Sequence, residues 1–265
     1  MGLRVVACQL DAAWEDSVES CRRAAALLDR ERPPRGSLVV FPEMFASGFS
    51  MNVDATAEGP ARLGERFLAE SARRLGVCVL GGVVNRDTPG ALALNQAVAF
   101  GADGAEVARY SKIHPFSYAG EDRHFARGNE VVTFPWGAFM VAPFVCYDLR
   151  FPEIFRVAAL RGATVLAVIA NWPAPREEHW LALLAARAIE NQAYVVGVNR
   201  CGRDPNVAYS GRSRVVDPRG RVVAEGGSGE CAVSAELDLD ALLAYRREFP
   251  VLADADPRFL PGLLP

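Results

Sequence analysis

The segment at residues 141–153, V-A-P-F-V-C-Y-D-L-R-F-P-E, most constrains the fold of this chain. An apolar run reaches Cys146 and stops, the polar Asp148 and Arg150 follow, and Pro152 opens a helical pattern. The pattern predicts a strand that ends in a sharp turn into a helix, with a thiol at the corner. The N–H groups and positive dipole end of that helix would favour a thiolate and a nearby oxyanion. The alternative is that Cys146 is a buried, small apolar residue, as most free cysteines are.

Composition and charge exclude several classes of protein. The chain has 265 residues, of which 51% are hydrophobic, and a formal net charge of −3. It can therefore bury a full core, and it lacks the basic surface expected for binding nucleic acid or an anionic membrane. No apolar run approaches the roughly 18 residues that span a bilayer, and the N-terminal sequence lacks the pattern of a signal peptide. We expect a protein that binds neither nucleic acid nor membrane.

The cysteines and histidines indicate neither disulfides nor a metal site. Cys8, Cys78 and Cys146 lie in or at the end of apolar strands, and no two of the 6 cysteines form a C-x-x-C pair. We therefore expect reduced thiols and a cytoplasmic location. The 3 histidines are scattered without an H-E-x-x-H spacing, so no zinc site is expected.

Predicted strands and helices are mixed throughout the chain. Strands are predicted at residues 3–9, 37–41, 77–84, 93–100, 106–110, 131–134, 139–145, 164–170, 193–198, 211–216, 221–224 and 231–237. Helices are predicted at residues 18–32, 61–75, 153–161, 176–192 and 239–247, with Ser17 and Asp238 as the caps of the first and last. Because hairpins occur among the strands, the pattern predicts an α/β fold with two sheets between outer helices.

The chain has no evident linker and no repeat at a fixed period. We therefore expect one domain over residues 1–265, with a Pro- and Asp-rich tail from about residue 250 that wraps the surface or a partner. Two long irregular stretches remain, at residues 44–60 and 111–129. In the first, Phe45, Phe49 and Met51 either line a pocket or anchor the loop on the core. The second is long enough to indicate a functional loop.

Residues with reactive or polar side chains follow four of the predicted strands. Glu43, Cys146 and Asn171 each come after a buried apolar run, and Lys112 follows V-A-R-Y-S. Strand ends on one edge of a sheet are where α/β proteins place ligand sites. A thiol, a carboxylate and an ammonium suit acyl transfer: the acid moves protons, the thiolate attacks a carbonyl carbon, and the ammonium and a backbone N–H hold the oxyanion.

Three motifs occur in this order: F-P-E-M-F around Glu43, Y-S-K-I-H-P-F around Lys112, and V-C-Y-D-L-R-F-P-E around Cys146. Together they resemble the nitrilase, or carbon–nitrogen hydrolase, superfamily, over residues 5 to about 237. The resemblance implies a single-domain, four-layer αββα sandwich that acts on a small-molecule amide without a metal or an organic cofactor. It also implies a homodimer packed through the helices after Cys146 and Asn171, and the predicted helix at 176–192 is unusually apolar for a surface element.

The same resemblance implies a role for each motif residue. Cys146 would be the nucleophile, Glu43 the general base and Lys112 the oxyanion stabiliser. The backbone N–H of Tyr147 would be the second oxyanion donor. Glu121 resembles the family's second glutamate, which positions the lysine and shapes the pocket.

Further stretches resemble the ω-amidase branch of the superfamily: M-F-A-S-G-F-S-M at 44–51, the segment 171–192, and G-V-N-R-C-G at 197–202. Those enzymes hydrolyse the side-chain amide of 2-oxoglutaramate or 2-oxosuccinamate to the 2-oxo acid and ammonia. The substrate is a small carboxylate, so the resemblance implies a cationic group in the pocket.

Three residues are candidates for substrate binding. Arg150 either binds the substrate carboxylate or is structural and held by Asp148. Phe116 and Trp172 either form pocket walls or pack in the core. These alternatives stay open at the level of the sequence.

Other functions are compatible with parts of the pattern. The same catalytic residues would serve an amidase acting on an N-carbamoyl or aliphatic amide, or a nitrile hydrolase. A non-catalytic binding protein on this fold would be expected to have lost Glu43, Lys112 or Cys146, and all three are present. A redox-sensing Cys146 would show reversible peroxide sensitivity without amide turnover.

Overall fold

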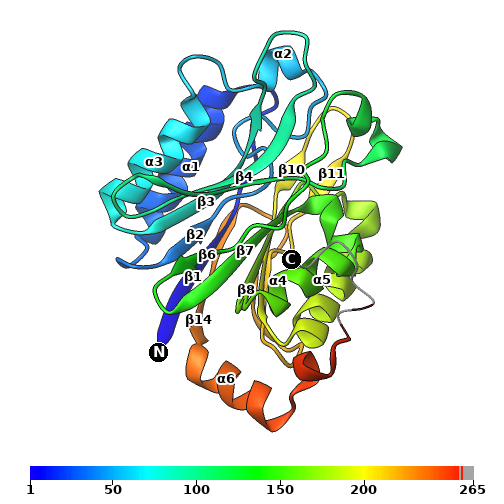
Figure 1. Ribbon diagram of the computed structural model, residues 1–265. Coiled ribbons are helices and arrows are strands. Elements are labelled where there is room, and N and C mark those ends of the chain that lie inside the picture. The colour runs from blue at the N-terminus through cyan, green and yellow to red at the C-terminus, as the bar shows by residue number, and fades with distance from the viewer. Residues whose placement is uncertain (257, 259–265) are drawn as a thin grey trace.

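The central strands are apolar at nearly every position because both of their faces are covered. In the computed structural model, which describes residues 1–256 and 258, two six-stranded sheets stack face to face and helices cover their outer faces (Figure 1). In spatial order, the first sheet contains β14 (Cys231–Asp238), β1 (Gly2–Gln9), β2 (Leu38–Val40), β3 (Cys78–Asn85), β4 (Leu94–Phe100) and β5 (Glu106–Ser111). The second contains β13 (Val222–Glu225), β12 (Arg214–Val216), β9 (Tyr194–Asn199), β8 (Val165–Ala170), β7 (Phe139–Val145) and β6 (Phe134–Trp136). The predicted αββα sandwich is confirmed.

Helices cover the two outer faces. In Figure 1, α1 (Ser17–Glu31) and α3 (Leu63–Leu75) cover the first sheet, and α4 (Pro152–Leu160) and α5 (Glu177–Asn191) cover the second. The remaining helices are α2 (Val53–Thr56) and α6 (Leu239–Glu248), with 3₁₀ turns η1 (Ser117–Ala119), η2 (Glu121–Arg123), η3 (Cys146–Arg150), η4 (Ala174–Arg176) and η5 (Val251–Asp254). Within residues 1–256 and 258, no helix combines the length and the hydropathy needed to cross a membrane.

The alternation of side chains along β1 divides the core into two layers. Val5 and Ala7 pack between the two sheets, whereas Val6 and Cys8 pack beneath α1 and α3. Successive strand residues point to opposite faces of a sheet, so each strand of this kind contributes to both layers. This double burial explains why the sequence of β1 is an apolar run rather than an apolar–polar alternation.

The direction of the strands brings the predicted strand ends together. β1, β2 and β3 are parallel, and so are β7, β8 and β9. β5 runs parallel to β3 because β4 is antiparallel to both. Glu43 therefore follows β2, Lys112 follows β5, Cys146 follows β7 and Asn171 follows β8 at one edge of the sandwich.

Several predicted elements differ from the structure. The strand predicted at 131–134 is wrong, because β6 begins only at Phe134, where pairing with β7 starts. The loop predicted after β9 contains a small hairpin, β10 (Cys201–Arg203) and β11 (Ala208–Ser210), which lies outside both large sheets. The strand predicted at 211–216 starts at Arg214.

The helix caps were predicted with mixed success. Asp238 caps α6, and its side chain accepts hydrogen bonds from the N–H groups of Asp240 and Ala241. The cap of α1 is Asp16 rather than Ser17, and its carboxylate accepts from the N–H of Glu19. The predicted tail begins with η5, which contacts α5, and its end falls outside the described residues.

Candidate active site

A buried lysine lies between two buried carboxylates at the strand ends. Lys112 Nζ donates to Glu43 Oε1 at 2.9 Å and to Glu121 Oε1 and Oε2 at 3.1 and 2.8 Å. The side chains of Lys112, Glu43 and Glu121 are only 1%, 0% and 0% exposed. Burial by itself lowers the pKa of the Lys112 ammonium, but Glu121 and Glu43 outweigh burial, and the net effect is a raised pKa. The ammonium is therefore permanently charged at physiological pH.

Two asparagines orient Glu43 within this cluster. Asn171 donates to Glu43 Oε2 from its backbone N–H at 2.8 Å, and its side-chain amide donates to the Glu43 carbonyl at 2.8 Å. Asn95 Nδ2 donates to Glu43 Oε1 at 2.7 Å and to Glu121 Oε1 at 2.8 Å. Asn95 was not predicted from the sequence. It lies near the start of the antiparallel β4, whereas the predicted site residues were those that directly follow strands.

A glycine allows β3 to approach Glu43 closely. A Cβ atom added to Gly82 would lie 2.5 Å from Glu43 Cα and 2.4 Å from the backbone nitrogen of Met44. Phe45 N–H and Gly82 N–H also bond across this contact, to Gly82 O and Pro42 O. The absence of a side chain at Gly82 thus allows the close approach, and the two hydrogen bonds hold the backbone on either side of Glu43 in place.

Cys146 occupies the corner between β7 and η3. Its φ of 48° lies in the left-handed region that non-glycine residues rarely adopt. Such strain in a residue next to a cavity is typical of functional sites. The side chain is 8% exposed and lines a cavity of about 400 Å³.

The prediction that this turn favours a thiolate is wrong. Burial raises the pKa of the Cys146 thiol well above its usual value, and Glu43, which also hydrogen-bonds to the thiol, raises it further against the opposing effect of Lys112. The predicted helix α4 starts only at Pro152, after η3, and a dipole effect is confined to the first turn of a helix. The resting sulfur therefore holds its proton, and Glu43 is positioned to accept it.

Asp148 stabilises the turn at Cys146 through several hydrogen bonds. It accepts hydrogen bonds from Tyr110 Oη at 2.7 Å, from Val145 N–H at 3.1 Å and from His114 N–H at 3.0 Å. The hypothesis that Asp148 holds Arg150 is therefore wrong, because its oxygens are occupied by these other donors. Arg150 instead lies over the Trp172 ring, at 4.7 Å from its centroid, and contacts His179 Nδ1 at 3.2 Å.

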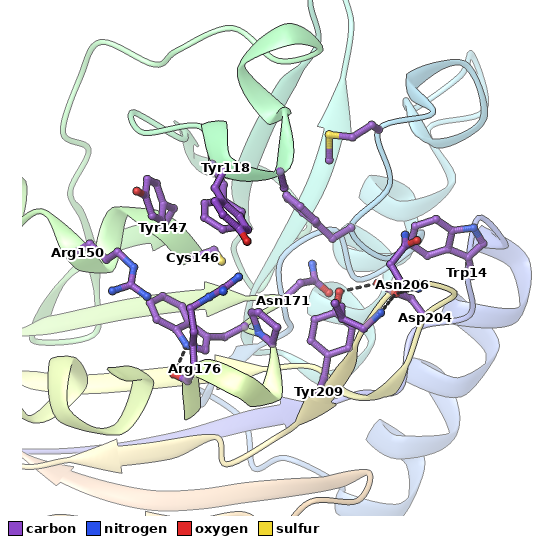
Figure 2. Close-up of a pocket in the computed structure, with 17 residues that line it drawn as sticks. Trp14, Tyr118, Cys146, Tyr147, Arg150, Asn171, Arg176, Asp204, Asn206 and Tyr209 are labelled. Carbon is purple, nitrogen blue, oxygen red and sulfur yellow. Dashed lines mark hydrogen bonds between the residues drawn. The ribbon is translucent and has the colours of Figure 1, made fainter. Parts of the chain in front are cut away.

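The cavity is mostly apolar and opens above Cys146. Phe116, Arg150 and Trp172 all line the cavity, and Trp172 also packs in the core. Figure 2 shows Tyr147 and Arg150 on one side of Cys146, and Asp204, Asn206 and Trp14 on the other. The lining comprises Trp14, Phe49, Met51, Phe116, Tyr118, Ala119, Cys146, Tyr147, Arg150, Asn171, Trp172, Pro173, Arg176, Asp204, Asn206, Val207 and Tyr209.

Of the three candidate pocket residues in the loop at 44–60, two line the cavity. Phe49 and Met51 do so, and Lys112 Nζ lies 5.5 Å from the centroid of the Phe49 ring. Phe45 is fully buried against Phe41, with ring centroids 5.3 Å apart, and anchors the loop on the core. Both interpretations of this loop were therefore partly right.

The fold and the site are those of a hydrolase that acts on carbon–nitrogen bonds. The model of the carbon-nitrogen hydrolase family matches residues 2–247, and the chain belongs to that family. It is 39% identical over 259 residues to an omega-amidase, YafV, of Yersinia enterocolitica, with 96% of this chain and 97% of that protein covered.

A second relative and a solved structure agree with this assignment. The 2-oxoglutaramate amidase of Bacillus subtilis (strain 168) is 34% identical, with 93% of this chain and 95% of that protein covered. The crystal structure of XC1258 from Xanthomonas campestris, a CN-hydrolase superfamily protein with an arsenic adduct in its active site, superposes with a TM-score of 0.89. It is 34% identical, with 97% of this chain and 98% of that one covered. The predicted membership of the superfamily is confirmed.

Proposed function

We propose that the protein is an ω-amidase that hydrolyses the side-chain amide of 2-oxoglutaramate or 2-oxosuccinamate to the 2-oxo acid and ammonia. The observation that carries the proposal is the buried cluster of Lys112, Glu43 and Glu121, which lies beside Cys146 at the wall of the cavity. The amidase activities of the relatives in Yersinia and Bacillus support the choice of substrate.

The first half of the reaction forms a thioester. The Cys146 proton passes to the Glu43 carboxylate, and the sulfur attacks the amide carbon. The carbonyl electron pair moves to oxygen, where Lys112 Nζ and the Tyr147 N–H stabilise the negative charge. Collapse of this intermediate breaks the C–N bond, and the leaving nitrogen takes the proton from Glu43 to depart as ammonia.

The second half returns the enzyme to its resting state. Water loses a proton to Glu43 and attacks the thioester carbon, and the same two donors hold the oxyanion. The C–S bond breaks, the product acid leaves, and the sulfur regains its proton from Glu43. Because the resting thiol has a raised pKa, its proton is available for this cycle at neutral pH. Glu121 acts by holding Lys112 through two hydrogen bonds.

Arg150 is the cation that we assign to the substrate carboxylate. It lines the cavity with Trp172 and Phe116, and no acidic side chain of residues 1–256 and 258 forms an ion pair with it. Arginine forms two parallel hydrogen bonds with a carboxylate. Phe116 and Trp172 would enclose the short carbon chain of the substrate.

We infer further that the whole chain is one domain and that the protein is a cytoplasmic homodimer. The 6 cysteines are all unpaired, which agrees with a reducing compartment. Ile189 on the outer α5 is 52% exposed, and a partner covering α4 and α5 would bury it. Light scattering coupled to gel filtration would give the mass of the assembly, and a monomer would contradict the dimer.

The test is ammonia release from 2-oxoglutaramate, measured beside glutamine, an N-carbamoyl amino acid and a simple nitrile. The Cys146→Ala variant serves as the blank. Release from the 2-oxo amide alone supports the ω-amidase function. Ammonia release only from another substrate would contradict the substrate assignment and leave the cysteine mechanism intact. Wild-type rates in Cys146→Ala would contradict the mechanism itself.

A further inference from the structure

Two arginines, not one, line the cavity. Arg176 ends η4, directly before α5, and its side chain lies over the rings of Phe116 and Tyr118, with Cζ 5.5 and 5.4 Å from their centroids. Figure 2 shows Arg176 and Arg150 on the same part of the wall, near Cys146. Burial lowers the pKa of Arg150, and the charge of Arg176 adds to that effect, as expected for neighbouring cations.

Neither guanidinium has an acidic partner. In the described part of the chain, no carboxylate forms an ion pair with Arg150 or Arg176, whereas the similarly half-buried Arg23, Arg86, Arg109 and Arg212 each have one. Asp204, an acid that also lines the cavity, lies across it in Figure 2. Its oxygens accept from the N–H groups of Asn206 and Val207 and from Tyr209 Oη, so they are already satisfied.

Partly buried charges are normally paired, and two like charges on one wall repel each other. Aromatic rings, rather than carboxylates, lie next to both guanidinium groups. Trp172 lies under Arg150, and Phe116 and Tyr118 lie under Arg176. Stacking uses the face of a guanidinium and leaves the N–H groups at its edge free to bind an anion.

The exposure of Tyr118 is also explained by its contact with the Arg176 guanidinium. This ring is 82% exposed, which packing against the core does not require, yet it lies at the cavity and in contact with Phe116 and Arg176. Its position fits a platform that holds the Arg176 side chain over the cavity.

We propose that Arg176 is a second substrate-binding residue, which together with Arg150 forms a two-arginine site for the carboxylate of the substrate, with Tyr118 as its positioning residue. The inference rests on the proposed function for the identity of the amide, but the anion site itself does not. It assigns specificity to charge: an acyl chain with a carboxylate is preferred over a neutral chain of the same length.

The first experiment measures this preference. Initial rates with 2-oxoglutaramate and with pentanamide, a neutral amide of the same chain length, are compared for the wild type, Arg176→Gln, Arg176→Lys and the control Arg221→Gln. Arg221 is an exposed arginine in the turn between β12 and β13. Arg176→Gln is expected to lower kcat/KM for 2-oxoglutaramate roughly 10- to 100-fold, mainly through KM, as for one lost charge-assisted hydrogen bond. Arg176→Lys recovers part of the loss because it keeps the charge, and Tyr118→Leu gives a smaller rise in KM.

The second experiment separates this inference from the proposed function. In the Cys146→Ala background, binding of 2-oxopentanoate, which has the carboxylate but no amide, is compared with binding of its neutral methyl ester. A Kd for the acid that rises tenfold or more on Arg176→Gln, with a thermal midpoint within 2 °C of the parent, supports the anion site even if the enzyme does not hydrolyse 2-oxoglutaramate. An unchanged Kd, or equal binding of acid and ester by the parent, overturns the inference even if 2-oxoglutaramate is a good substrate.

Discussion

Replacing Lys112 with methionine should separate the structural role of this lysine from its catalytic role. In the variant, Glu43 and Glu121 remain fully buried and share only the amide of Asn95 as a common donor. Removing one partner of a buried ion pair costs about 3–5 kcal/mol, because it leaves an uncompensated charge. In a domain of this size, that loss lowers Tm by roughly 6–20 °C.

The pH dependence of this loss has a definite sign. In the wild type, the raised pKa of Lys112 contributes stability that is present below the unfolded pKa of about 10.5 and is lost only at higher pH. In Lys112→Met, the two crowded carboxylates favour protonation, so stability should fall as pH rises from 5 to 8. Thermal melts at pH 5, 6, 7 and 8 measure this slope, which should be steeper in the variant than in the wild type.

A double variant tests the explanation. Lys112→Met/Glu121→Gln removes one of the two stranded charges and should recover a large part of Tm at pH 8. The rate should stay about 10²–10³-fold below that of the wild type, because the oxyanion donor is still missing. A Lys112→Met protein with wild-type Tm at every pH would refute the buried ion pair, and one with wild-type turnover would refute the oxyanion role.

Three further outcomes are expected. Gly82→Ala should reduce kcat by at least about tenfold with little change in KM, because the added methyl displaces the Glu43 backbone. Gly59→Ala, whose added methyl meets no atom within 4 Å, is the control, and equal kcat values for the two variants would contradict this explanation. Asp148→Asn should lower Tm, because an amide nitrogen cannot accept the hydrogen bonds given to the carboxylate. Each hydrogen bond lost should cost about 1.5–3 kcal/mol. A Tm equal to that of the wild type would show that these hydrogen bonds do not stabilise the fold. Burial, aided by Glu65, raises the pKa of Glu58 to about 7, so its charge destabilises the fold increasingly as pH rises from 4.5 through 7. Glu58→Gln should therefore raise Tm at pH 8 and not at pH 4.5, and a gain that is equal at both pH values would exclude this cause.

The sequence determined the layered architecture because burial on both faces leaves an evident pattern. Short, β-branched apolar runs such as residues 165–170 favour strands covered on two sides, and the amphipathic helices between them are then expected to cover the outer faces. Local motifs were equally informative, since Glu43, Lys112 and Cys146 each follow a strand in a characteristic string. Their order along the chain was sufficient to indicate the family.

What the sequence could not determine depends on groups that meet only in the folded chain. Asn95 carries no local signal, and its role exists because antiparallel β4 places it beside Glu43 and Glu121. The resting state of Cys146 was predicted wrongly, because the helix dipole is a local property, whereas burial and the Glu43 charge come from the tertiary structure.

The same reason explains the two arginines of the pocket. Arg150 and Asp148 are neighbours in sequence, but β5 and the following loop bring Tyr110 and His114 to Asp148 and leave Arg150 free to face the cavity. Arg176 is separated from Arg150 by a whole strand, and no spacing rule connects them. The sequence thus determined the fold and indicated the residues proposed to react, whereas the tertiary structure decided their protonation, their hydrogen-bond partners and the charge of the pocket, because those properties depend on distances between segments remote in the chain.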